Sequence, residues 1–178
     1  MSIAEIRPAS VEDLLGIARV FSQAFPDSLI HTFGRIPEPD FVSEAFRVCL
    51  DAEPGAFFVA HSEGQVVGYA FTPARLSNLW RTAIINGHVW RWISSTLTGR
   101  FRLGWHPVRT VLSNKGSFFA SALDRRYAID ARILSIAVMP DYQGQGIAGG
   151  LLDHGLSYLR AQNVSRVRLE VRPTNIPA

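Results

Sequence analysis

The stretch Leu134-Ser-Ile-Ala-Val-Met-Pro-Asp-Tyr-Gln-Gly-Gln-Gly-Ile-Ala-Gly-Gly-Leu-Leu152 decides the fold of this chain. An apolar run with β-branched residues ends at Pro140, a glycine-rich turn follows, and an amphipathic helical pattern begins near Ile147. A strand that leads through a glycine turn into a helix brings unpaired backbone N–H groups and the positive end of the helix to one point. The stretch therefore predicts a cradle for a phosphate or pyrophosphate group.

Two kinds of loop have this form, and the first is the dinucleotide-binding fingerprint G-x-G-x-x-G. Gly144, Gly146 and Gly149 match it. Glu170 lies where an acid that binds ribose is expected. However, four residues separate the strand from these glycines, and the segment 166–172 alternates in polarity, whereas strands of a doubly covered parallel sheet are continuously apolar. Too few residues follow Glu170 for the second half of such a sheet, so we disfavour this interpretation.

The second kind of loop fits better. The segment Gln143-Gly-Gln-Gly146-Ile-Ala148 has the Q/R-x-x-G-x-G/A form of the GNAT superfamily of acyl-CoA-dependent N-acetyltransferases, which this sequence resembles. The segment Leu169-Glu-Val-Arg-Pro-Thr-Asn175 is similar to the strand after the pyrophosphate helix in the ribosomal-protein alanine acetyltransferase branch. The order of expected elements also resembles that family, up to about Pro73 and again from Arg132 onward.

This resemblance implies acetyl-CoA as the co-substrate. Its pyrophosphate is expected on the backbone N–H groups of the glycine loop, and its pantetheine arm on the preceding strand, which in the family splays from the next strand. A backbone N–H near Val138 is then the candidate oxyanion donor. The cofactor-binding residues expected in this way are Ile136, Ala137, Val138, Gln143, Gly144, Gln145, Gly146, Ile147, Ala148, Gly149 and Asn175.

Glu170 is the candidate catalytic residue. It falls on the glutamate of the L-E-V-R motif, and the resemblance implies that it acts as a general base, directly or through a water. A base that works near neutral pH needs its pKa raised by burial or by a nearby acid. The alternative is a solvated strand acid between Arg168 and Arg172, and the sequence leaves that alternative open.

The expected function is transfer of acetyl from acetyl-CoA to a primary amine by direct attack in a ternary complex. The acceptor, a small molecule or a peptide, is not indicated. In the family a helix with a tyrosine that protonates the thiolate, and two further strands, follow the asparagine motif; this chain stops at Ala178, so we expect a C-terminally truncated domain. The alternative function is a catalytically impaired module that binds CoA, a membrane or a partner. A homodimer through the uncovered strand 166–172 is the alternative to truncation.

Composition restricts the other classes of function. Hydrophobic residues make up 47% and charged residues 19% of the 178 residues, as in an ordinary globular domain. No apolar run is long enough to span a membrane and no secretion signal is present, so we expect a cytoplasmic protein. Cys49, the single cysteine, lies on an apolar helical stripe and is interpreted as a small buried hydrophobe. The five histidines show no paired ligand spacing, so we expect no metal.

The segment 74–130 is interpreted as a basic, tryptophan-rich, largely helical insertion within a single domain spanning residues 1–178. Residues 74–128 contain nine Arg or Lys side chains against Asp124 alone, and all four tryptophans lie there. A contact with the sheet or with a second copy is favoured over contact with anionic membranes. Nothing in the segment resembles a nucleic-acid motif, so no nucleic-acid partner is expected.

The predicted fold class is α+β, with a mixed, mainly antiparallel GNAT-like sheet flanked by helices and lacking the last helix and strands of that family. Strands are expected at 3–8, 55–61, 65–72, 134–140 and 166–172. Helices are expected at 10–25, 39–50 and 78–97, and from residue 147 onward. Pro26 and Asp27 are expected to end the first helix, and Glu63-Gly64 to form a hairpin turn.

Overall fold

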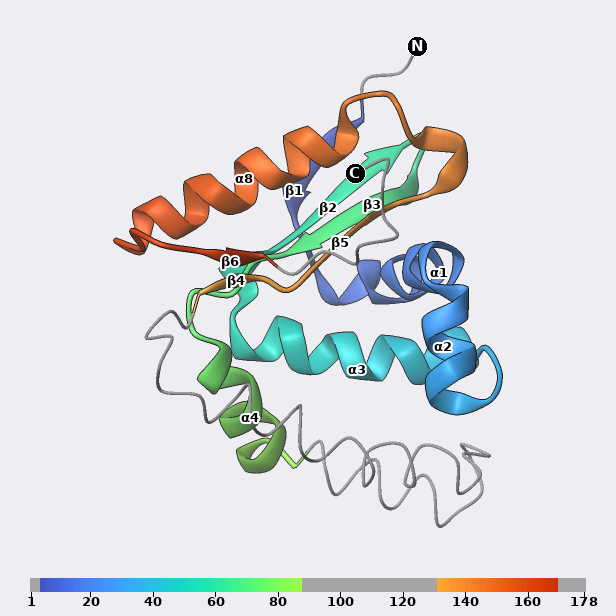
Figure 1. Cartoon of the computed structure of the whole chain (residues 1–178), viewed down its shortest axis with the longest axis horizontal. Helices are drawn as coiled ribbons and strands as arrows, with labels where there is room; N and C mark the ends of the chain where they lie inside the picture. Colours follow the sequence, from blue (N-terminus) through green and yellow to red (C-terminus); the bar gives the residue numbers. More distant parts are fainter. Residues whose placement is uncertain (1–3, 88–130, 170–178) are drawn as a thin grey trace.

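The computed structural model describes residues 4–87 and 131–169, which form a twisted sheet between layers of helices (Figure 1). The strands β1 (Glu5–Pro8), β2 (Phe57–Ser62), β3 (Gln65–Phe71) and β5 (Ser135–Val138) are antiparallel neighbours in the order β1-β2-β3-β5. Two short strands, β4 (Arg132–Ile133) and β6 (Arg168–Leu169), pair in parallel. The predicted class, α+β with a mainly antiparallel sheet, is confirmed.

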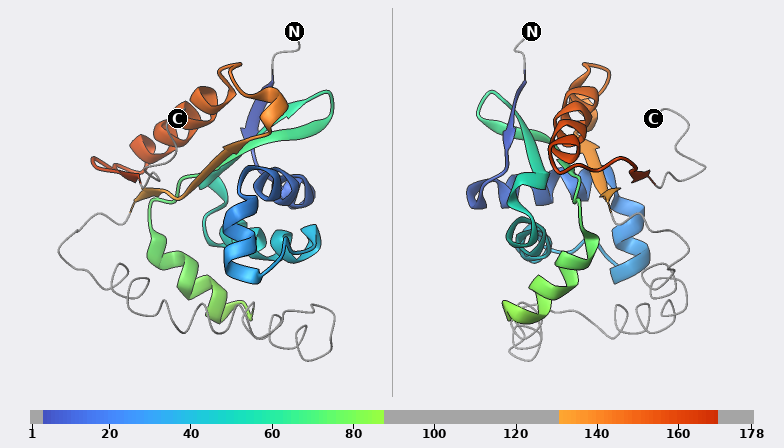
Figure 2. Two further views of the ribbon diagram at one scale, coloured as in Figure 1. Left: turned by 45° about the vertical axis from the view of Figure 1, so that its right-hand side comes forward. Right: turned by 90° about the vertical axis from the view of Figure 1, so that its left-hand side faces the viewer.

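Helices cover both faces of the sheet (Figures 1 and 2). They are α1 (Leu14–Ala24), α2 (Pro26–Phe33), α3 (Pro39–Ala52), α4 (Leu76–Ile85) and α8 (Ile147–Ala161), with 3₁₀ turns η1 (Val11–Asp13), η2 (Pro54–Ala56) and η3 (Pro140–Tyr142). Helices α1 and α3 pack together on one face, and α8 crosses the other.

The alternation of side chains along the strands divides the core in two. Phe57 and Val59 of β2 point into a cluster with α1 and α3, whereas Phe58 and Ala60 point into a second cluster with Ile147 and other residues of α8. Because both faces of β2 and β3 are covered, these central strands are apolar on both sides.

The β2–β3 hairpin has the predicted turn. Glu63 and Gly64 both have positive φ, 52° and 77°, which is the backbone twist that a two-residue hairpin turn of type I′ requires. A register shift beside Ala60 and His61 marks a β-bulge in this pair.

One expectation about the first helices was wrong. Pro26 and Asp27 end α1 as predicted, but Pro26 is also the first residue of a new helix, α2, which the sequence analysis did not include. Proline suits the first helical position because its fixed φ is already helical and the missing N–H has no partner there. The helix ends at Gly34, whose φ is 74°.

Most of the other boundaries agree with the predictions within a few residues, and several expectations fall outside the described ranges. The expected helix 78–97 is present as α4 only up to Ile85, because residues 86 and 87 form a turn in which Gly87 has a φ of 73°, so the helix does not continue as predicted. Residues 88–130 of the insertion lie outside the described residues. The expected strand 166–172 is present as β6, and residues after Leu169 are outside that range. The expected loss of a final helix and strands therefore stays a prediction.

Candidate active site

The continuous segment that forms β4 and β5 stays bonded on one edge to the end of β3 and the residues after it, since the N–H of Arg132 donates to Pro73 and that of Leu134 to Phe71. Within residues 4–87 and 131–169, its other edge is paired only before Leu134. Before this residue, Ile133 pairs with Leu169 of β6; after it, Ser135 pairs with Phe71 of β3. In the described part of the chain, no strand pairs with the other edge of β5. The structure therefore contains a fork: along the same edge of the segment, β4 is paired with β6, whereas β5, which follows, is unpaired in the described residues. The splay that the family resemblance implied involves residues after Leu169, which are not described.

The open edge of β5 presents backbone groups of Ile136 and Val138. The N–H of Met139 donates to the carbonyl of Val67 across the β3 ladder at 2.8 Å. Because hydrogen-bonded and non-bonded pairs alternate in an antiparallel ladder, Ala137 bonds to β3 while its two neighbours face away from it. The carbonyl of Val138 agrees with this direction, since it accepts a hydrogen bond from Nε2 of Gln143 at 3.1 Å.

The glycine loop turns the chain from the end of β5 into α8. Gly144 and Gly146 have φ of 73° and 79°, a region in which residues with a Cβ are strained, so the loop needs glycine for its backbone path. A Cβ added at either position would meet nothing within 4 Å, so crowding by the protein is not the reason.

The start of α8 leaves N–H groups without helical partners. The N–H of Gly150 donates to the carbonyl of Gly146 at 3.0 Å, so the N–H groups of Ile147, Ala148 and Gly149 precede the first helical bond. Helix α8 has no acidic side chain in its first turn to compete for them, whereas α2 and α3 do. This end of the helix favours an anion that comes from outside the chain.

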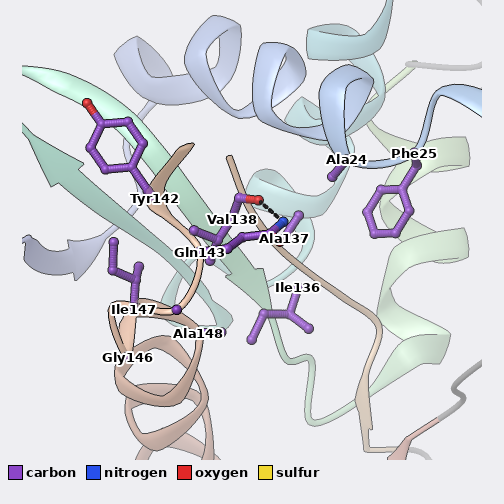
Figure 3. A pocket seen from close by; sticks show the side chains of 11 residues that line it. Ala24, Phe25, Ile136, Ala137, Val138, Tyr142, Gln143, Gly146, Ile147 and Ala148 are labelled. Atoms are coloured by element: carbon purple, nitrogen blue, oxygen red, sulfur yellow. Dashed lines mark hydrogen bonds between the residues drawn. The ribbon is translucent and has the colours of Figure 1, made fainter. Parts of the chain in front are cut away.

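A pocket of about 380 Å³ joins the open strand edge to this helix end (Figure 3). Of the expected cofactor-binding residues, the structure brings together Ile136, Ala137, Val138, Gln143, Gly144, Gly146, Ile147 and Ala148 around it. Gln145 and Gly149 are exposed and do not line it, and Gln145 donates instead to the carbonyl of Asp141 at 3.4 Å. Glu170 and Asn175 lie outside the described residues.

Three lining residues were not assigned to the site from the sequence: Ala24, Phe25 and Tyr142. Tyr142 precedes the Gln143–Ala148 motif and is not part of it. Ala24 and Phe25 come from the end of α1, more than a hundred residues earlier, and no local pattern marks them. Phe25 packs on Phe21 with ring centroids 5.2 Å apart and forms the wall opposite Ile136 (Figure 3).

The lining combines backbone donors with apolar side chains and contains no charged side chain. Such a surface suits a ligand with an anionic group at the helix end and an extended, largely uncharged arm along the strand. The described residues contain no group of three or more His, Cys, Asp or Glu side chains that could hold a metal ion. No helix in residues 4–87 or 131–169 is both long and apolar enough to cross a bilayer.

Cys49 and His154 pack in the structure away from the pocket. Cys49 lies on the buried face of α3, and its burial raises the pKa of the thiol to about 12, which disfavours the reactive thiolate and confirms the packing interpretation. His154 forms a hydrogen bond through Nδ1 with the carbonyl of Gly150 at 2.9 Å and lies against Phe58, outside the pocket.

Comparison with known proteins agrees with the fork and the loop. The model of the acetyltransferase (GNAT) family matches residues 17–178. The chain belongs to the GNAT family. Over 91 residues it is 32% identical to the [ribosomal protein bS18]-alanine N-acetyltransferase of Escherichia coli K12, a match that covers 51% of this chain and 60% of that protein. The chain thus aligns with less than two thirds of this curated relative.

Solved structures show that this GNAT-family chain has the fold of its relatives. The crystal structure of SsHAT superposes with a TM-score of 0.69 at 22% identity, covering 98% of this chain and 85% of that one. A GNAT-family acetyltransferase from Brucella melitensis, solved in complex with acetyl-CoA, superposes with a TM-score of 0.52 at 15% identity, covering 99% and 81%. Identities this low establish the fold alone.

Proposed function

We propose that this GNAT-family chain is an N-acetyltransferase that binds acetyl-CoA in the pocket between β5 and α8. The observation that carries the proposal is the continuity of the pocket: one end is formed by unpaired N–H groups of α8, and its side by the unpaired edge of β5. The pyrophosphate would lie on the N–H groups of residues 143–149, and the pantetheine arm would run along Ile136, Ala137 and Val138. Asn175 would contact the same arm.

The proposed reaction is direct transfer in a ternary complex. The nitrogen of the acceptor amine attacks the thioester carbon, a C–N bond forms, and the C–S bond breaks to release CoA. Glu170 would take the proton from the amine, and a backbone N–H on the open edge of β5, between Ile136 and Val138, would stabilise the oxyanion. The alternative is a chain that binds CoA without transfer, or that contacts a membrane or partner through its basic segment 74–130.

Cofactor binding is tested by placing a charge at the helix end. Ala148 is an exposed lining residue at the second position of α8. An Asp at this position favours the helix, because carboxylates interact well with its first turn, but it opposes a bound pyrophosphate. We expect Ala148→Asp to weaken CoA binding by at least about tenfold in calorimetry, from Coulomb repulsion at short range.

Ala148→Asn is the matched control, since it has nearly the same shape without the charge. It should bind CoA within a few-fold of the original chain. Equal CoA affinity in the Asp and Asn variants would show that no anion occupies this helix end, and the cofactor assignment would then be wrong.

Transfer is tested with amines and with a base variant. One relative is named for acetylating an alanine of ribosomal protein bS18, so the first probe is a short peptide with N-terminal alanine. A screen of small primary amines accompanies it. We expect thiol release from acetyl-CoA that requires a free amine, since the same peptide with a blocked N-terminus should be inert. Glu170→Gln should lower kcat by about 10²–10⁴ while leaving CoA affinity similar. CoA binding without amine-dependent thiol release would favour the non-catalytic alternative.

A further inference from the structure

A hydroxyl pair lies at the fork between β5 and β6. Tyr69 of β3 is fully buried, and its hydroxyl oxygen is 2.6 Å from Oγ of Ser135, the first residue of β5. Neither hydroxyl has another hydrogen-bond partner among the described residues. Ser135 itself is only partly buried, so this pair connects the core to the open side of the fork.

The chemistry of the two hydroxyls determines which one donates the hydrogen bond. A buried phenol that does not donate its proton leaves a polar group unsatisfied, which is costly in the core. The phenol is also the more acidic of the two hydroxyls and thus the better donor. Tyr69 therefore donates to Ser135, and the proton of Ser135 is left to donate to a group outside the core.

Ser135 lies at the end of β5 where the acyl end of a bound ligand would be. It follows Leu134 at the base of the fork and precedes Ile136, where the pocket lining begins. An arm that starts at the glycine loop must run back along β5 from Val138 toward Ile136. Ser135 adjoins Ile136 at about 3.3 Å per residue along the strand, so its hydroxyl and the open-edge N–H of Ile136 can reach the same acyl oxygen at this end of the arm.

We propose that Ser135, oriented by Tyr69, donates a hydrogen bond to the carbonyl oxygen of the acyl thioester. This inference rests on the proposed binding of acetyl-CoA and specifies which side chain recognises the acyl group. A carbonyl oxygen needs a donor, and the Ser135 hydroxyl has one to offer, whereas the free thiol of CoA lacks this acceptor. Ser135 is thus a residue that contacts substrate, and Tyr69 is a positioning residue that acts through it.

The pair is unsuited to proton transfer. Burial raises the pKa of Tyr69, and a serine hydroxyl is a weaker acid still, so neither group would readily give its proton to a departing thiolate. The role of the pair is to hold a neutral hydrogen bond in place. It should therefore alter affinity for the acylated ligand and leave the shape of any pH–rate profile unchanged.

The test compares acetyl-CoA with CoA by calorimetry and so needs no acceptor. Ser135→Val removes the hydroxyl while keeping a side chain that strands favour, and Ser135→Thr keeps the hydroxyl on nearly the same shape. We expect Ser135→Val to weaken acetyl-CoA binding by about 3- to 10-fold, the usual size of one hydrogen bond, with CoA affinity unchanged. Ser135→Thr should retain the preference for acetyl-CoA.

Tyr69→Phe should also lower the ratio of acetyl-CoA affinity to CoA affinity, by a smaller factor than Ser135→Val. The double variant should lose no more acetyl-CoA affinity than Ser135→Val alone. Ser135→Ala replaces the valine variant if the latter does not fold. An equal loss of affinity for both ligands, or no loss for either, would overturn the assignment of Ser135 while leaving the cofactor site intact. An original chain that binds neither ligand would overturn the proposed function as well.

Discussion

At the scale of single residues, Asp13 is the most heavily hydrogen-bonded side chain in the described structure. Its carboxylate accepts two bonds from Arg7, both at 2.8 Å, and two from the backbone N–H and hydroxyl of Ser10. His61 Nε2 lies 2.9 Å from the carboxylate and 3.1 Å from Arg7, so this nitrogen either donates to Asp13 or accepts from Arg7. These contacts fix the start of α1 against β1 and β2, and the other end of α1 forms the pocket wall.

The contacts of Asp13 predict how the free energy of unfolding depends on pH. Burial raises the pKa of Asp13, but the hydrogen bonds from Arg7, Ser10 and His61 outweigh burial and lower the pKa from 3.8 to about 2. Because the pKa of Asp13 is lower in the folded protein than in the unfolded chain, its carboxylate stabilises the fold fully above the unfolded-state pKa of 3.8. This stability is lost as pH falls toward 2. Asp13→Asn should therefore lower the free energy of unfolding by about 2 kcal/mol at pH 7.

Urea unfolding at several pH values checks this expectation. The difference between the original chain and Asp13→Asn should shrink as pH falls from 5 toward 2, since protonation removes the same charge that the substitution removes. Asp40→Asn, at an exposed acid in the first turn of α3, is the control and should change stability little. A difference that stays constant down to pH 2 would contradict the assigned ionisation.

At the scale of elements, glycines set the distance between α8 and the sheet. A Cβ on Gly155 would lie 2.6 Å from the side chain of Thr72, and one on Gly150 would lie 2.7 Å from Ile6. A Cβ on Gly149, in the same helix, would meet nothing within 4 Å. Gly150 and Gly155 therefore serve the close approach of α8 to the sheet.

Paired substitutions in α8 separate these roles. Gly155→Ala should destabilise the protein by about 1–3 kcal/mol, because the added methyl group pushes α8 away from the buried Thr72. Gly149→Ala should stabilise it by about 0.4–1 kcal/mol, since alanine restricts the unfolded chain and has free space here. Equilibrium unfolding in urea measures both. Similar effects of the two substitutions would show that packing against Thr72 is not what requires glycine.

At the scale of the whole molecule, Glu53 connects three distant parts of the chain. It follows α3, accepts a hydrogen bond from the hydroxyl of Tyr158 on α8 at 2.8 Å, and accepts one from the N–H of Ala74 at 2.7 Å. A Cβ on Gly55 would lie 2.9 Å from the Tyr158 ring, which packs against this turn. Burial and the neighbouring carboxylate raise the pKa of Tyr158, so the phenol stays a donor.

Tyr158→Phe should remove this link while keeping the ring. We expect a loss of about 0.5–1.5 kcal/mol in the free energy of unfolding, the usual net worth of a hydrogen bond. Amide hydrogen exchange should become faster at Ala74, because its carboxylate partner is held less firmly. Unchanged exchange at Ala74 together with unchanged stability would show that α8 is held to this region by the apolar contacts alone.

The sequence by itself determined the local features of this protein. The apolar runs on either side of the Glu63-Gly64 turn predicted β2 and β3, and the glycine loop between an apolar strand and an amphipathic helix predicted β5 and α8 and indicated the family. These features are readable because each depends on residues close together in the chain. Pro26 was ambiguous for the same reason: it can end one helix and begin another, and only the packing of α2 on α1 distinguishes the two.

Only the tertiary structure decided which distant residues meet. Ala24 and Phe25 complete the pocket, Tyr69 orients Ser135, and Asp13 joins three elements, although none of these contacts leaves a local pattern. Each side chain looks ordinary in its own segment: a helix end, a strand aromatic, an acid near a helix start. Their roles arise because antiparallel pairing and packing on both faces of the sheet place them within hydrogen-bond or van der Waals distance, and that placement depends on the whole chain at once.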